Sequence, residues 1–185
     1  GAPLWRNEPT RDDFAPQLLT LGGSQRGDFD LVHEVLSPPR GELIFREIAV
    51  NYARSMIFGR FGRIPFCGLP GSPMTSFVAF EAFVRPALWK LAGRRVLEWP
   101  RVEALLSQPL PAATARALFY PVWVEARAEG LMATPLRLEK AADLPPQALA
   151  NGLIYCATES PACPAGTRGW VNLLEPVGTS QSMGG

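Results

Sequence analysis

One feature of the sequence constrains the fold more than any other: a strand-like segment, MIFGRFGRIPFCG, leads into the tight loop GLPGSP and then into a long pattern with helical spacing. Ser72 is a good N-terminal cap, Pro73 suits the first helical position, and Gly93 is a good C-terminal stop. The sequence therefore predicts a strand, a turn and a helix over about residues 73–92. Pro86 should kink this helix, because proline cannot donate its backbone hydrogen bond.

The apolar residues of this pattern recur at steps of three and four, which predicts one buried helix face. They are Phe77, Phe80, Val84, Leu88 and Leu91.

A similar arrangement occurs earlier in the chain. The short apolar run LLTL at residues 18–21 predicts a buried strand, and the loop GGSQRGDFD and a helix over about residues 28–36 follow it. Further strands are expected in ELIFREIAV and in two segments of MIFGRFGRIPFCG that meet at a glycine bend. The pattern indicates an α/β fold, in which ligands bind to loops at the carboxyl ends of strands.

The composition and the hydrophobic pattern of the sequence change after Gly93. Prolines become frequent, and short β-like runs replace the helical periods, with a hairpin expected about Ala128-Glu129-Gly130. We predict an α/β domain over residues 1–93, a small all-β domain over 94–178, and a tail over 179–185.

Composition excludes several functions. Of the 185 residues, 47% are hydrophobic and the net charge is only +1, which argues against binding nucleic acid through bulk electrostatics. The sequence contains neither an apolar run long enough to span a membrane nor an apolar signal core, so we expect a cytoplasmic protein without a membrane partner. The one histidine, His33, offers little for a histidine-based site. Three cysteines argue against a disulfide framework and indicate structural thiols in a reducing compartment.

The GLPGSP loop is the strongest candidate for chemistry. Backbone N–H groups at a helix start are unpaired and lie at the positive end of the helix dipole, so Gly71, Ser72 and the first turn can hold a phosphate. Gly68 and Gly71 would let a ligand approach the main chain closely. The alternative is a simple strand-to-helix turn with a good cap.

The GGSQRGDFD loop is the second candidate. Gly22, Gly23 and Gly27 permit unusual backbone angles, and Asp28 and Asp30 place two carboxylates at the entry of the next helix. Two carboxylates near a phosphate site are typical of Mg²⁺. The alternative is that both aspartates cap the helix.

Together, the segments GG-x3-GDFD, GLPGSP, FVRPAL and ANGLI resemble molybdopterin molybdenumtransferase, the family of bacterial MoeA and the gephyrin E domain. The resemblance covers about residues 18–176. It implies the C-terminal part of a three-layer, MogA-like α/β domain, incomplete at its N-terminus, followed by a small all-β, barrel-like domain. It also implies a homodimer, or a partner chain that supplies the missing half.

The implied function lies in molybdenum cofactor biosynthesis: binding adenylylated molybdopterin and inserting molybdenum from molybdate, with Mg²⁺ and release of AMP. The resemblance gives Asp30 and Arg54 catalytic roles. It also implies that Asp28 and Asp30 bind the metal ion. It places the pterin substrate at a wider set of residues. These are Gly22, Gly23, Gly27, Ser55, Gly68, Pro70, Gly71 and Ser72.

The sequence departs from the family pattern at several polar positions. Ser24-Gln25-Arg26 replace Val-Ser-Val in the first loop, and in the segment that reads PGKP in the family Asn51 replaces a cation and Arg54 a lysine. These changes support an alternative function, a degenerate paralogue that binds molybdopterin or a protein partner without catalysis. A third hypothesis makes both loops structural and the β domain a peptide-binding module.

Overall fold

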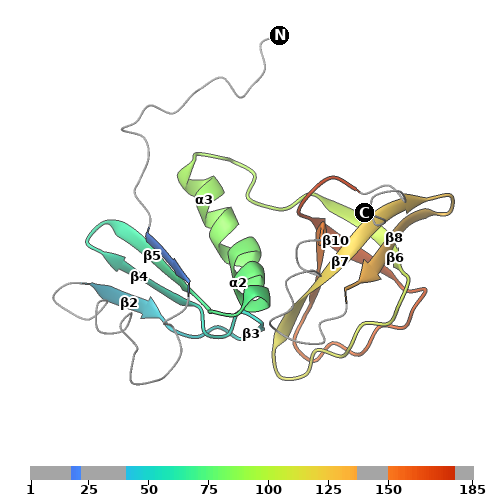
Figure 1. Ribbon diagram of the computed structural model, residues 1–185, viewed down its shortest axis with the longest axis horizontal. Coiled ribbons are helices and arrows are strands. Elements are labelled where there is room, and N and C mark those ends of the chain that lie inside the picture. The colour runs from blue at the N-terminus through green and yellow to red at the C-terminus, as the bar shows by residue number, and fades with distance from the viewer. Residues whose placement is uncertain (1–17, 22–40, 137–149, 178–185) are drawn as a thin grey trace, which may run out of the picture.

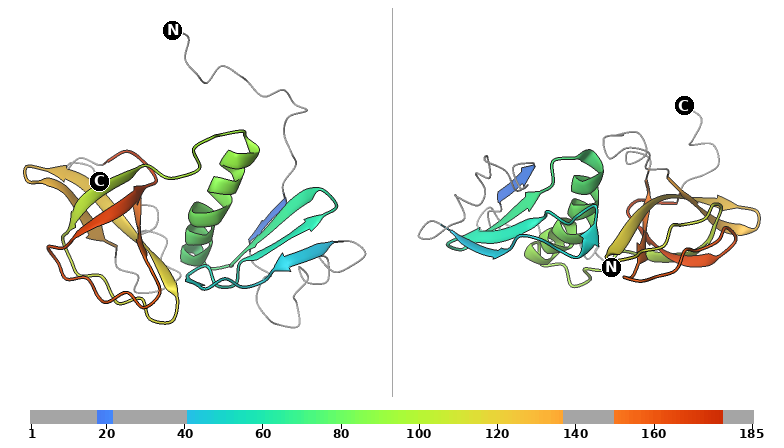
Figure 2. Two further views of the ribbon diagram at one scale, coloured as in Figure 1. Left: turned by 180° about the vertical axis from the view of Figure 1, so that it is seen from behind. Right: turned by 90° about the horizontal axis from the view of Figure 1, so that it is seen from below.

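The computed structural model describes residues 18–21, 41–136 and 150–177. These residues form a four-stranded sheet, one interrupted helix and a small β-barrel. The helix lies between the sheet and the barrel in both Figure 1 and Figure 2. The fold class is the one the sequence indicates, an α/β domain followed by a barrel-like domain, and the described residues supply the sheet and one helical layer.

The first sheet has the order β1-β5-β4-β2. Its strands are β1 (Leu18–Leu21), β2 (Glu42–Phe45), β4 (Ile57–Phe61) and β5 (Ile64–Leu69). β1 runs parallel to β5, whereas β4 runs antiparallel to both of its neighbours. Strands β4 and β5 form a hairpin whose turn contains Gly62, with a φ of 57° that suits glycine. The strands predicted at 18–21 and on either side of the glycine bend are confirmed. The burial predicted for 18–21 is wrong, because this strand lies at the edge of the described sheet and exposes Leu18, Leu19 and Leu21.

The single strand expected in ELIFREIAV is wrong. β2 ends at Phe45, and the chain then forms β3 (Val50–Asn51), which pairs in parallel with the barrel strand β7. The chain changes sheets because Val50 pairs with Ala117, a residue far along the sequence. No local pattern encodes such a distant partner.

The predicted helix is confirmed and has three parts. They are α2 (Pro73–Ala79), a π-helical turn (Phe80–Val84) and α3 (Arg85–Leu91). The π turn lies directly before Pro86, so the irregularity predicted at this proline takes the form of a wide turn. Gly93 ends the helix with a φ of 75°, and the N–H of Arg94 donates to the carbonyl of Trp89 at 2.9 Å.

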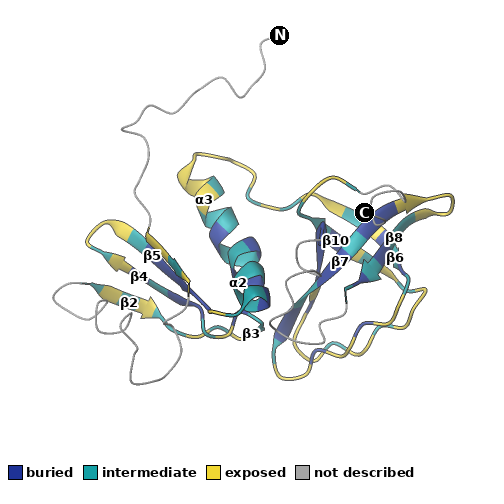
Figure 3. Ribbon diagram, in the orientation of Figure 1, coloured by how far each residue is buried: buried dark blue, intermediate teal, exposed yellow. Residues whose placement is uncertain are grey.

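The buried face of this helix differs from the predicted stripe. Leu88 and Leu91 are 37% and 41% exposed. The buried residues lie nearer the start of the helix, as Figure 3 shows, because this part packs against the sheet and the barrel. They are Met74, Val78, Ala79, Glu81 and Val84.

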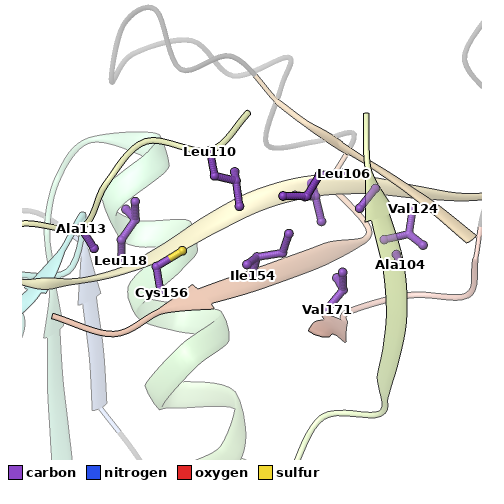
Figure 4. Close-up of a cluster of buried hydrophobic side chains, with 11 residues drawn as sticks. Ala104, Leu106, Leu110, Ala113, Leu118, Val124, Ile154, Cys156 and Val171 are labelled. Carbon is purple, nitrogen blue, oxygen red and sulfur yellow. The ribbon is translucent and has the colours of Figure 1, made fainter. Parts of the chain in front are cut away.

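The second sheet closes into a five-stranded barrel, because β7 pairs with both β8 and β9 in the order β7-β8-β6-β10-β9. Its strands are β6 (Arg101–Leu106), β7 (Ala117–Arg127), β8 (Gly130–Pro135), β9 (Gly152–Cys156) and β10 (Arg168–Leu173). The predicted hairpin is confirmed, since Arg127 pairs with Gly130. Inward-facing side chains from all five strands fill the barrel (Figure 4).

Contacts also cross the predicted boundary at residue 93. The ring of Phe119 from β7 packs edge-on against Phe83 of the helix, with 6.2 Å between centroids. Phe119 also joins the cluster of apolar side chains between the helix and the first sheet. The helix therefore packs against both the first sheet and the barrel. The division into residues 1–93 and 94–178 stays a prediction.

Candidate functional site

Two loops and the end of a strand meet at one edge of the first sheet. Leu21, the last residue of β1, pairs with Leu69, the last residue of β5. β4 runs antiparallel to β5, and its first residue, Ile57, pairs with Gly68. The GLPGSP loop, the turn before β4 and the end of β1 therefore lie together. This is the edge at which the sequence predicts a ligand site.

The GLPGSP loop leads into the helix with an uncapped first turn. Ser72 has the extended conformation of an N-cap (φ −82°, ψ 142°), but its side chain makes no capping hydrogen bond. Instead, its hydroxyl lies 2.5 Å from that of Thr75, and the Thr75 hydroxyl also contacts the Ser72 carbonyl at 2.9 Å. Ser72 thus leaves the N–H groups of Met74 and Thr75 to other acceptors, which suits an anion at this helix start.

The residues of this loop differ in their accessibility. Gly68 and Pro70 are buried, Ser72 is half-buried and Gly71 is exposed. A Cβ atom on Gly68 would lie 3.3 Å from the Cβ of Ile57, so strand packing already accounts for the glycine there. Ligand contact at this loop is therefore best supported for Gly71 and Ser72.

The turn before β4 holds Arg54 and Ser55. The exposed Arg54 guanidinium lies 3.5 Å from the Glu47 carboxylate, an ion pair of the kind that contributes little stability in water. Tyr52, in the same turn, has a φ of 65°, which is uncommon for a residue other than glycine. Arg54 is thus a cation at the same sheet edge as the GLPGSP loop, although it does not supply a free charge.

One polar group at this edge was not singled out from the sequence. The Thr20 hydroxyl is buried and has no hydrogen-bond partner among the residues that the structure describes. Thr20 pairs with Gly68, one residue before the end of β1. No pattern in the sequence around Thr20 indicates that its hydroxyl is buried.

Five of the predicted site residues lie outside the described residues: Gly22, Gly23, Gly27, Asp28 and Asp30. His33 lies there as well. Within residues 18–21, 41–136 and 150–177, no group of three or more His, Cys, Asp or Glu side chains could hold a metal ion. The magnesium site at Asp28 and Asp30 stays a prediction from the sequence.

An ion pair links a buried glutamate of the π turn to a partly exposed arginine at the start of α3, and the sequence reasoning missed it. The Glu81 carboxylate is 4% exposed and accepts a hydrogen bond from Arg85 at 2.5 Å. The Arg85 guanidinium stacks on the Trp99 ring, and the indole N–H of Trp99 donates to the Glu81 carbonyl at 3.3 Å. Burial raises the pKa of Glu81, against the opposing effect of Arg85. The i, i+4 spacing of Glu81 and Arg85 was the available signal.

Comparisons with known proteins match most of the chain to molybdopterin-related proteins. Residues 11–90 match a family described as "Probable molybdopterin binding domain". The chain is also 28% identical over 153 residues to the molybdopterin molybdenumtransferase of Bacillus subtilis, and 32% identical over 108 residues to that of Haemophilus influenzae. These matches cover 83% and 57% of this chain.

A solved structure, the MoeA protein of Pyrococcus horikosii, has the same fold over 80% of the chain, with a TM-score of 0.66 and 26% sequence identity. The chain is similar to the C-terminal portion of MoeA proteins. It spans 34% of the Bacillus subtilis relative, 26% of the Haemophilus influenzae relative and 35% of the Pyrococcus horikosii protein. The resemblance seen in the motifs of this MoeA-like chain is therefore confirmed.

None of the helices in the described parts of the chain is both long and apolar enough to span a membrane.

Proposed function

We propose that the chain binds molybdopterin through its terminal phosphate at the sheet edge formed by the ends of β1 and β5. The observation that carries the proposal is the pairing of Leu21 with Leu69. It brings the uncapped helix start next to the strand end from which the GGSQRGDFD loop departs. Both loops that match the family pattern thus begin at one place.

The described residues would act by binding and orienting the phosphate. The N–H groups of Met74 and Thr75 would donate to its oxygens, and the helix dipole would favour its charge. Arg54 would exchange its exposed partner Glu47 for the phosphate, because a guanidinium binds phosphate with paired hydrogen bonds. Ser55 and Gly71 would border the phosphate on either side.

In this proposal, Asp28 and Asp30 are the residues that would hold Mg²⁺. When bound, it would neutralise phosphate charge. The phosphate contacts proposed above are made by the chain's own N–H groups and by Arg54.

In the longer proteins that this chain resembles, we propose that the site serves insertion of molybdenum from molybdate into adenylylated molybdopterin, with Asp30 as a catalytic residue. The rest of such a protein, a second copy or a partner chain would complete the site. β1 supports this, because it lies at the edge of the described sheet and exposes Leu18, Leu19 and Leu21. Exposed apolar edge strands normally have a covering partner.

A binding titration tests the phosphate site. Ser72→Asp should keep the fold, since aspartate is a strong N-cap, but its carboxylate would take the free N–H groups and repel the phosphate. We expect molybdopterin affinity to fall at least about tenfold, which is 1.4 kcal/mol. Thr158→Asp places the same charge on an exposed barrel position and serves as the control. Equal affinity of both variants would refute the site.

The second candidate function is a paralogue that binds molybdopterin or a protein partner without catalysis. Asn51 favours it, because this neutral residue lies in β3 and pairs with Leu118, where the family pattern has a cation. Complementation of a strain that lacks the insertase, with the full-length protein and its Asp30→Ala variant, separates the two functions. Growth that depends on Asp30 supports catalysis, whereas binding without growth supports the paralogue.

A further inference from the structure

A cavity lies in the barrel, where β9 and β10 separate. The two strands pair from Gly152 with Leu173 to Ile154 with Val171, and the pairing ends there. Beyond this point a cavity of about 250 Å³ opens into the barrel. Apolar side chains from the barrel core line it together with two thiols, those of Cys156 and Cys163.

Both thiols face the same interior. Cys163 and Leu110 exchange two backbone hydrogen bonds, of 2.9 and 3.1 Å, so their side chains lie on the same side of the pair. Leu110 is 2% exposed and belongs to the barrel core, and Cys163 packs against that core from its rim. Cys156 is itself a core member (Figure 4).

The two thiols also interact electrostatically. Burial raises the pKa of Cys156, and the negative charge of a Cys163 thiolate raises it further. Cys156 is buried, whereas Cys163 is partly exposed. One thiol is therefore accessible to a small oxidant, and the other lies behind it in the same cavity.

The segment between the cysteines is ordered by backbone hydrogen bonds. Ser160 donates to the carbonyl of Ala157 at 3.1 Å, which forms a turn within the segment, and Ala113, outside it, donates to the carbonyl of Ser160 at 3.0 Å. The turn shortens the span of the chain between Cys156 and Cys163.

We propose that Cys156 and Cys163 form a peroxide-sensitive dithiol that closes to an intramolecular disulfide. Cys163 loses its proton, and the thiolate attacks one oxygen of the peroxide. The O–O bond breaks, Cys163 becomes a sulfenic acid, and the departing hydroxide takes up the proton from Cys163 and leaves as the first water. Cys156 then loses its proton, its thiolate attacks the Cys163 sulfur, and the S–O bond breaks as the S–S bond forms. The departing hydroxide takes up the proton that Cys156 lost and leaves as the second water. Two thiols are oxidised, and one peroxide is reduced to two waters.

The third cysteine serves as an internal control. Cys67 is buried in the first lobe, and no other cysteine belongs to its apolar cluster. It should stay reduced under mild peroxide.

Mass spectrometry of the full chain tests the proposal. After peroxide treatment and alkylation of free thiols, cleavage after Glu159 separates Cys156 from Cys163. We expect the two fragments to remain joined until a reductant is added, while Cys67 is alkylated throughout. In Cys156→Ala, Cys163 should accumulate as a sulfenic acid that a dimedone probe traps.

Three outcomes would overturn the proposal. The first is that both thiols are still alkylated after the treatment. The second is oxidation of each to separate sulfur oxyacids in the wild type. The third is a disulfide between two chains. Because the wild type itself gives these results, the test does not depend on the folding of a variant.

Discussion

Thr20 of β1 lies opposite Gly68 of β5, and its hydroxyl would be 3.6 Å from a Cβ atom placed on that glycine. The Cβ atom of Ile57, on the neighbouring strand β4, would be 3.3 Å from the same added atom. The missing side chain at Gly68 therefore allows three strands to come together directly below the GLPGSP loop. The close packing of these strands fixes the sheet edge on which the proposed phosphate site depends.

Thr20→Val tests the buried hydroxyl at this edge. The substitution removes an oxygen that has no partner among the described residues and keeps the shape of the side chain. An unpaired buried hydroxyl costs about 1–3 kcal/mol, so the melting temperature should stay equal or rise. Thermal unfolding of both proteins measures this. A clear drop in melting temperature would show that the hydroxyl makes a stabilising hydrogen bond.

Gly152→Ala should destabilise the barrel strongly. The new methyl group would stand 2.6 Å from Cγ1 of Val171, well inside contact distance, and overpacking of this kind costs about 1–3 kcal/mol. Gly169→Ala is the matched control in β10, because nothing lies within 4 Å of its added methyl group. Urea unfolding should show a lower midpoint for Gly152→Ala alone. Similar midpoints for the two variants would contradict the packing described for β9.

Asn151 should be essential for joining β9 to β7. Its side-chain oxygen accepts from the N–H of Val124 at 2.6 Å, and its amide donates to the Val124 carbonyl at 2.8 Å. Asn151→Ala removes both partners of buried backbone groups, and a loss of at least about 2 kcal/mol is expected. Asn172→Ala, at a half-buried position of β10, should cost less than about 1 kcal/mol. The free energies of unfolding of the two variants measure the difference. An equal loss in both would show that Asn151 does not join β9 to β7 as described.

Glu81 should give stability a characteristic pH dependence. Burial raises its pKa from the ordinary 4.5, so the folded state favours the protonated carboxyl. Its contribution is therefore fully present below pH 4.5 and is lost as the pH rises through the folded-state pKa. Relative to Glu81→Gln, which cannot titrate, the wild type should become less stable over that range. Urea unfolding of both proteins across about pH 4–8 measures the difference. A difference that does not change with pH would contradict the raised pKa.

The parts of the fold that depend on local signals could be predicted from the sequence. Pro73 and Gly93 mark the ends of the helix, and Gly130 marks the hairpin, because each acts on its own stretch of backbone. The sheet edge follows from the same logic, since the loops that follow two parallel strands leave on one side.

Features that depend on distant residues could not be predicted. Val50 pairs with Ala117 in the barrel, and Glu81 is buried because Trp99 and Arg85 cover it. Leu88 is exposed although it continues the apolar spacing, because the helix packs mainly through its first turns. Each outcome depends on which surfaces meet in the folded chain, and helical spacing does not specify that.

Hydrogen exchange with and without molybdopterin tests the central claim most directly, because it shows where the ligand binds. Bound phosphate should slow exchange at Met74 and Thr75 and in the peptide that follows Leu21, and leave the barrel strands unchanged. Protection confined to the barrel, or no protection at saturating ligand, would contradict a phosphate site at the ends of β1 and β5.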